Sequence, residues 1–130
     1  YLTDDLSEPT KYRIPDGSPE EVTVPAHGYL VFIADGEDTQ GALHTNFRLS
    51  GSGESIGLFD TDQAANQVVD IISFDEQSSN VAFGRLPSGE DTWMPLGAAT
   101  PGAANTNVVL DNHIYLPILS VPSPSRSDCR

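Results

Sequence analysis

Short apolar segments alternate with clusters of glycine, proline and aspartate along most of this chain, and this alternation constrains the fold more than any other feature. Segments of strand length recur at a spacing of roughly eight to twelve residues. No stretch combines a sustained helical period with capping residues, so we expect at most a single helical turn, near Ala64–Asn66. The pattern predicts an all-β fold, built as a sandwich or a barrel.

The strongest strand signal lies in Tyr29–Asp35, a nearly continuous run of apolar and aromatic residues that predicts a strand covered on both faces. Ile56–Asp60 and Val68–Phe74 flank a turn-rich connection and predict a hairpin. The remaining expected strands and shorter extended pieces are Val81–Leu86, Thr92–Leu96, Tyr1–Thr3, Lys11–Ile14, Val22–Val24 and Asn46–Leu49.

The charge of the chain excludes several classes of partner. Lys and Arg total 6 against 19 Asp and Glu, which gives a formal net charge of -13 over 130 residues. A surface this negative repels phosphate backbones and anionic lipid, so we expect no nucleic-acid partner. No apolar run reaches transmembrane length, so we expect no membrane insertion.

Cysteine usage and composition indicate where the protein works. The single cysteine, Cys129, excludes a disulfide framework within the chain and leaves two interpretations open, a spare thiol or a disulfide between molecules. An acidic, cysteine-poor, turn-rich β chain suits an extracellular or cell-surface location, and the lack of an initiating Met predicts a processed or partial chain.

A resemblance follows from several short motifs in a fixed order. "KYRIP", "HGYLVF", "FRLS", "GESIGLFD", "FGRLP" and "TPGAAN" succeed one another between Tyr1 and Asn105. This part of the chain resembles a bacterial lamin tail domain. The resemblance implies an immunoglobulin-like β-sandwich over residues 1–105.

The chain departs from that family at its beginning, because the two strands that usually precede the segment at Tyr1–Thr3 are not in it. A sandwich without them would expose apolar side chains and unpaired backbone groups. Losing about four core side chains costs on the order of 6–12 kcal/mol. That is comparable with the net stability of a whole domain, about 5–15 kcal/mol. We therefore expect an incomplete sandwich that is completed by an added strand.

A late apolar segment, residues 106–121, is the expected donor of that strand. Its alternation places apolar residues on both faces, which describes a buried strand, although Pro117 removes one backbone donor. The segment either folds back onto its own domain or is donated to a neighbouring copy. The predicted donor interface consists of Val108, Leu110, Ile114, Tyr115, Leu116, Ile118 and Leu119. Residues 122–130 form a Ser/Pro-rich tail whose hydroxyls are candidate acceptors for O-linked glycans.

The sequence offers few candidate residues for metal binding or catalysis. Asp60 and Asp62 in "DTDQAANQ" are the best calcium candidates, but the loop lacks the glycine-turned spacing of a calcium loop, and solvated turn carboxylates are the alternative. The histidines have no metal-ligand spacing, and we expect His44 to serve in packing or a loop hydrogen bond. No nucleophile motif is present, so we expect neither a cofactor nor an enzyme.

The sequence leaves two functions open. The first is a non-catalytic extracellular structural protein that polymerises with copies of itself by donating residues 108–121. The second is a binding or accessory module, for protein or carbohydrate, that is a fragment of a larger secreted protein. Tyr1, Tyr12, Phe47 and Trp93 are of the type that stacks on sugars, but we expect them to pack in the core or at an edge.

Overall fold

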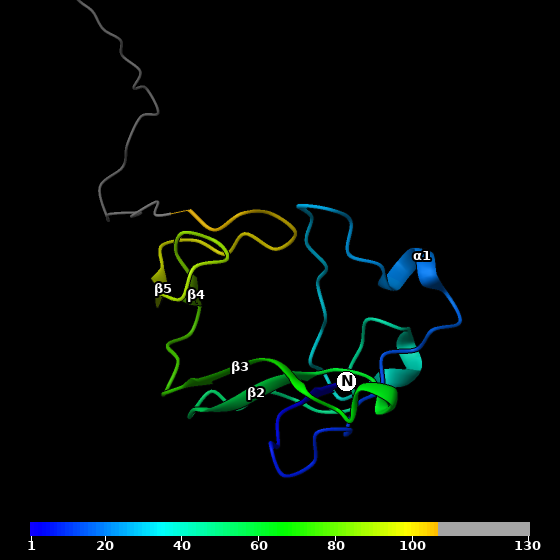
Figure 1. Cartoon of the computed structure of the whole chain (residues 1–130). Helices are drawn as coiled ribbons and strands as arrows, with labels where there is room; N and C mark the ends of the chain where they lie inside the picture. Colours follow the sequence, from blue (N-terminus) through cyan, green and yellow to red (C-terminus); the bar gives the residue numbers. More distant parts are fainter. Residues whose placement is uncertain (107–130) are drawn as a thin grey trace, which may run out of the picture.

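Two antiparallel sheets and very little helix make up the computed structural model, which describes residues 1–106 (Figure 1). The first sheet has three strands in the order β1-β2-β3, and the second pairs β4 with β5. The predicted all-β class is therefore confirmed. In Figure 1 the two sheets lie at different levels, with β4 and β5 above the left end of β2 and β3.

The predicted hairpin forms the centre of the first sheet. β2 spans Glu54–Phe59 and pairs antiparallel with β3, Val68–Phe74, while β1, Leu2–Thr3, pairs with the other edge of β2. Ile56 lies opposite Ile72, so apolar side chains pair across the strands. The connection contains a short 3₁₀ helix, η2 (Asp62–Ala64), which begins two residues before the helical turn expected at 64–66.

The second sheet follows the sequence prediction closely. β4 spans Ala82–Arg85 and β5 spans Trp93–Leu96, and the pair is antiparallel with Arg85 opposite Trp93. Both strands are shorter than the apolar segments that predicted them, since Val81 just before β4 bonds to Ser78 in a turn, while Leu86 and Thr92 continue the pairing with a single bond beyond the strand ends.

Residues 19–22 form a helix rather than the start of a strand. The four-residue helix α1, Pro19–Val22, has Pro at its first turn together with Glu20 and Glu21. Proline and acidic residues favour a helix start, and these local preferences outweigh the alternation that predicted a strand at Val22–Val24. A second short helix, η1, spans Asp38–Gln40.

The prediction of a covered strand at Tyr29–Asp35 was wrong. Only isolated bridges occur in this segment, from Ile33 to His44 and from Asp35 to Arg48. The side chains of Tyr29, Val31 and Ile33 are 45%, 42% and 46% exposed. The extended pieces expected at Lys11–Ile14 and Asn46–Leu49 are likewise reduced to single bridges, at Tyr12 and Arg48.

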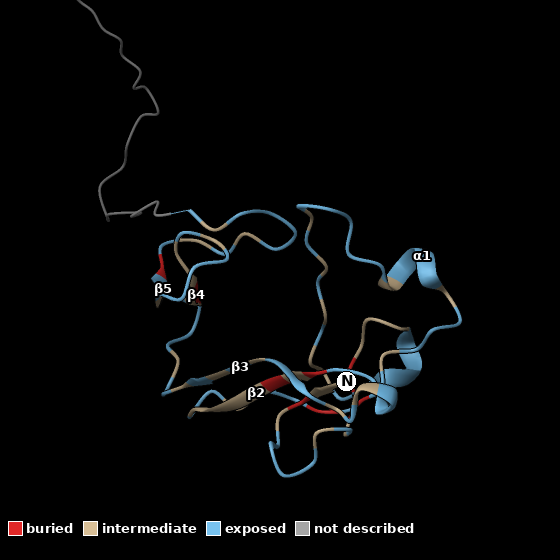
Figure 2. Ribbon diagram, viewed as in Figure 1, coloured by how far each residue is buried: buried red, intermediate tan, exposed pale blue. Residues whose placement is uncertain are grey.

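The core of the described part is small (Figure 2). Its buried hydrophobic residues are Tyr12, Phe47, Phe59 and Leu96. Two buried threonines each donate their hydroxyl to a backbone carbonyl two residues on, Thr3 to Asp5 and Thr45 to Phe47. These local bonds satisfy the buried hydroxyls without a water partner.

No helix within residues 1–106 is long and apolar enough to cross a bilayer. The predicted donor segment at 106–121 lies outside the described residues, apart from Thr106. The same holds for the Ser/Pro-rich tail and for Cys129.

Candidate functional site

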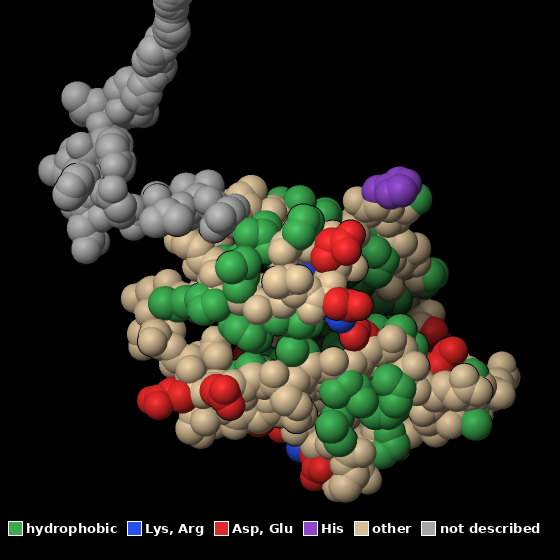
Figure 3. All heavy atoms as spheres, turned by 60° about the vertical axis from the view of Figure 1, so that its left-hand side comes forward, with side chains coloured by type: hydrophobic (Ala, Val, Ile, Leu, Met, Phe, Trp, Pro, Cys, Tyr) green, Lys and Arg blue, Asp and Glu red, His purple; other side chains and the backbone are tan. Residues whose placement is uncertain are grey.

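An apolar groove opens between the two sheets. It has a volume of about 350 Å³ and is lined by Leu49, Ser50, Gly51, Ile56, Ile72, Phe74, Gln77, Phe83 and Trp93. Its walls come from β2 and β3 on one side and from β4 and β5 on the other. Figure 3 shows hydrophobic side chains gathered around a hollow in the face that this view brings forward. We refer to this feature as the inter-sheet groove.

The wall formed by β4 and β5 is held by a column of stacked side chains. Phe83 stacks on Trp93 with ring centroids 5.8 Å apart, and the Arg85 guanidinium lies 4.7 Å from the centroid of the Trp93 ring. Arg85 donates two hydrogen bonds to the Asp70 carboxylate on β3, at 2.6 and 2.9 Å. These bonds lower the pKa of Asp70 and connect the two sheets through a bidentate pair.

The segment Tyr29–Ile33, which we call the open segment, is a second candidate site, because most of its backbone has no hydrogen-bond partner among the described residues. Between described residues, the backbone N–H and C=O groups of Tyr29–Phe32 make no hydrogen bond. Tyr29, Val31 and Ile33 alternate as exposed residues, whereas Leu30 and Phe32 are half-buried. In Figure 1 the segment, drawn in blue to cyan, runs between the two levels of the structure without a labelled strand beside it.

The end of the open segment is fixed by a group of bonds. The Ile33 amide donates to Leu43, and the Ile33 carbonyl accepts from the Thr45 amide, both at about 2.8 to 2.9 Å. Next to it, His44 Nδ1 lies 2.7 Å from Asp35 Oδ2. Burial acts to raise the pKa of Asp35, but the hydrogen bonds from His44 and from the Glu37 amide prevail and lower it. His44 therefore has the loop hydrogen bond expected of it.

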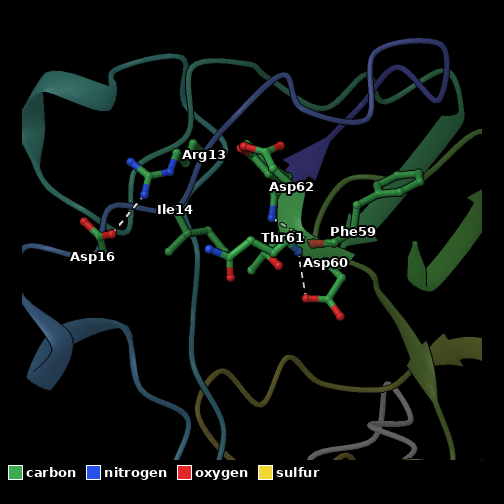
Figure 4. A pocket seen from close by; sticks show the side chains of 9 residues that line it. Arg13, Ile14, Asp16, Phe59, Asp60, Thr61 and Asp62 are labelled. Atoms are coloured by element: carbon green, nitrogen blue, oxygen red, sulfur yellow. Dashed lines mark hydrogen bonds and ion pairs between the residues drawn. The ribbon is translucent and has the colours of Figure 1, made fainter. Parts of the chain in front are cut away.

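The calcium candidates line a separate pocket of about 450 Å³ (Figure 4). Asp60 accepts from the Thr61 amide at 2.7 Å, and Asp62 accepts from the Tyr1 hydroxyl at 2.8 Å and from Asn66 at 3.1 Å. The hydrogen bonds from Asn66 and Tyr1 lower the pKa of Asp62. Both carboxylates thus serve in turn hydrogen bonds, and Arg13 brings a cation into the same pocket, where it pairs with Asp16 at 2.9 Å.

Metal and sugar sites are not assembled by the part of the chain that the structure describes. In residues 1–106, no cluster of three or more His, Cys, Asp or Glu side chains could hold a metal ion. The aromatic residues considered for sugar stacking are scattered, since Tyr12 and Phe47 are buried in the core and Trp93 stacks on Phe83.

The structure adds two sets of residues that the sequence did not single out. The lining of the inter-sheet groove was not predicted, although Trp93 and Phe83 were placed on adjacent strands. The open segment was predicted as a covered strand, so its strand-like composition was the available signal. Comparison with protein-family models, with curated proteins and with solved structures found no match to this chain.

Proposed function

We propose that this chain is a non-catalytic extracellular structural protein that assembles with copies of itself by β-strand donation, with Val108–Val121 as the donor. The observation that carries the proposal is the inter-sheet groove, an apolar opening with walls from both sheets. Exposed apolar surface of this kind is a feature of interaction sites, whereas single exposed apolar residues are ordinary.

The donor sequence suits a groove between two sheets. Packed sheets lie about 10 Å apart with their side chains interdigitated, so a strand that fills this groove joins one sheet and needs apolar side chains on the face that meets the other sheet. Val108–Val121 has this property, with Ile114, Leu116 and Ile118 on one face and Tyr115 and Leu119 on the other. Burying each of these large side chains contributes about 1.5–3 kcal/mol.

Donation to a second copy leads to a polymer. A donor at one end of a chain and an acceptor on its body form a heterologous contact, and such contacts repeat head to tail unless they close into a ring. The strand-addition mode uses backbone hydrogen bonds for affinity and side-chain pockets for specificity. We further propose that the fold is lamin-tail-like, because the order of its motifs and its two antiparallel sheets agree with that family.

Sedimentation velocity and electron microscopy of the full chain test this function. We expect filaments or a ladder of oligomers, and we expect a chain without residues 111–130 to remain monomeric because it lacks the donor. A chain without residues 122–130 is the matched control and should still assemble. A full chain that stays monomeric at all concentrations would contradict self-assembly and favour the accessory-module alternative.

A further inference from the structure

The open segment has the properties of an acceptor strand. Four successive residues, Tyr29–Phe32, have no backbone hydrogen bond to any described residue, although their sequence is the most strand-like in the chain. A strand edge with a row of unpaired N–H and C=O groups is a template for pairing with another strand. The exposed apolar side chains of Tyr29, Val31 and Ile33 supply the side-chain contacts of such pairing.

The open segment is held at both ends. Before it, the Gly28 amide donates to the Pro25 carbonyl at 2.8 Å and closes a turn. After it, the bridge from Ile33 to His44, the Asp35–His44 contact and the bond from Arg48 Nε to the Asp35 carbonyl at 2.6 Å fix the chain. The stretch between these anchors is therefore positioned before a partner arrives, which reduces the entropy lost on pairing.

We infer that the open segment, Tyr29–Ile33, is the acceptor strand and that Ile114–Ile118 of a second copy of this chain pairs with its backbone. The inference rests on the proposed self-assembly and assigns the backbone pairing of the donor to the open segment, which is distinct from the inter-sheet groove. Leu116 at the centre of the donor would then lie opposite Val31 at the centre of the acceptor.

The chain itself favours this occupant. Residues 114–119 are uncharged and apolar on both faces, so their approach to a molecule of net charge -13 adds no repulsion of their own. The described chain leaves the fold beside β4, where Asn105 donates from its backbone amide to Ser88 Oγ and from Nδ2 to the Arg85 carbonyl, both at 2.7 Å. The described chain therefore ends at the second sheet, and residues 107–113 join this point to the donor in the sequence.

Disulfide trapping between two different chains tests the pairing. In a Cys129→Ser background, one chain carries Tyr29→Cys, Val31→Cys or Ile33→Cys, and the other carries Ile114→Cys, Leu116→Cys or Ile118→Cys. The chains are mixed, oxidised and separated on a non-reducing gel. We expect a mixed dimer for at least one acceptor position, because opposed strand residues lie close enough for a disulfide.

Two control positions make the result specific. Val24→Cys is an exposed apolar position outside the open segment, at 55% exposure, and should not form the mixed dimer. Ile72→Cys reports on the inter-sheet groove. Assembled chains that cross-link through Ile72→Cys but through none of the three acceptor positions would overturn the acceptor assignment and leave the proposed function standing.

The remaining outcomes separate the two proposals. A chain that carries both Val31→Cys and Leu116→Cys and cross-links only within itself would overturn donation to a second copy. A full chain with no assembly at all would overturn the proposed function and this inference together.

As a second readout, Val31→Lys should weaken assembly at least tenfold while the circular dichroism spectrum is unchanged, and Val24→Lys should leave assembly as it is. Equal assembly of the two Lys variants would overturn the acceptor assignment.

Discussion

At the scale of single residues, Arg85 connects the two sheets. Its guanidinium lies over the Trp93 ring and also donates two hydrogen bonds to the Asp70 carboxylate. One side chain therefore connects β3, β4 and β5. Both contacts depend on the planar shape and fixed donors of the guanidinium. The ion pair between Arg85 and Asp70 therefore joins the second sheet to the first.

The Asp70–Arg85 pair predicts a pH dependence of stability. The hydrogen bonds from Arg85 lower the pKa of Asp70 in the folded state. A lowered folded pKa means that the pair stabilises the fold above the unfolded value, about 3.9 for Asp, and that this contribution is lost as the pH falls through the folded value. In urea unfolding, Asp70→Asn should therefore be less stable than the native chain at pH 7, and the difference should shrink as the pH falls below the pKa of Asp70 in the unfolded chain.

Asp75→Asn is the control for this prediction, because Asp75 is an exposed carboxylate directly after β3. It should change stability little at either pH. If the Asp70→Asn difference stayed the same at low pH, the loss would come from packing and not from the ionised carboxylate.

The turn after η2 offers a second prediction at this scale. Ala65 has φ 58° and ψ 32°, the left-handed conformation that costs an L-residue about 1–2 kcal/mol and costs glycine nothing. Ala65→Gly should therefore raise the free energy of unfolding by roughly 0.5–1 kcal/mol after the added chain entropy of glycine is subtracted. Ala64→Gly, inside the helical turn, should lower it by about the same amount. Urea midpoints that move in the same direction for both variants would contradict this explanation.

At the scale of elements, the sequence predicted those strands whose partners are near in the chain. β2 and β3 are joined by one turn, as are β4 and β5, so alternation and turn residues contain most of the information that their pairing needs. The helical turn at η2 lies two residues before its expected position, and it is closed by local bonds, since the Thr61 side chain accepts from the Ala64 amide.

The segments that prediction missed depend on distant partners. Tyr29–Asp35 has the composition of a strand, but a strand also needs a neighbour to hydrogen-bond with, and composition does not reveal whether one is available. Within residues 1–106 none is provided for Tyr29–Phe32. At Val22–Val24 the error has a local cause, because Pro19 and the acidic residues after it start a helix.

The contact between Asn105 and β4 predicts a coupled pair of mutations. A side chain at Gly84 would place its Cβ 2.8 Å from Asn105 Nδ2 and 3.1 Å from Leu96 Cδ1. Gly84→Ala should therefore destabilise the fold by about 1–3 kcal/mol through overpacking. Asn105→Ala should cost about 1–2 kcal/mol, because it removes the bond from Nδ2 to the Arg85 carbonyl.

Together the two substitutions should cost less than their sum. With alanine at position 105, the Cβ at position 84 no longer meets the amide, so the double-mutant cycle should give a coupling of about 0.5 kcal/mol or more. Chemical unfolding of the four proteins measures it. Strict additivity would show that Leu96, and not Asn105, limits the space at Gly84.

At the scale of the whole molecule, exposed apolar surface favours self-association and the high negative charge opposes it. The apolar groove and the open segment favour association, since they expose surface that a partner can bury. The charge opposes it, since two copies that each carry -13 repel one another. The alternation that suggests residues 108–121 as the proposed donor can be read from the sequence, whereas the groove and the open segment could not be predicted, because they exist only where the sheets come to lie in space.

This balance predicts that assembly strengthens with salt. Repulsion between copies extends over a Debye length of about 30 Å at 0.01 M ionic strength but only about 8 Å at 0.15 M, whereas the burial of apolar surface is not screened. Light scattering of the full chain should therefore show faster assembly at 0.15 M NaCl than at 0.01 M. A Glu20→Gln/Glu21→Gln variant, which removes two exposed charges from α1, should assemble faster than the native chain at low salt and depend less on salt. Assembly that weakens as salt is added would mean that attraction between opposite charges, and not donation of an apolar strand, holds the copies together.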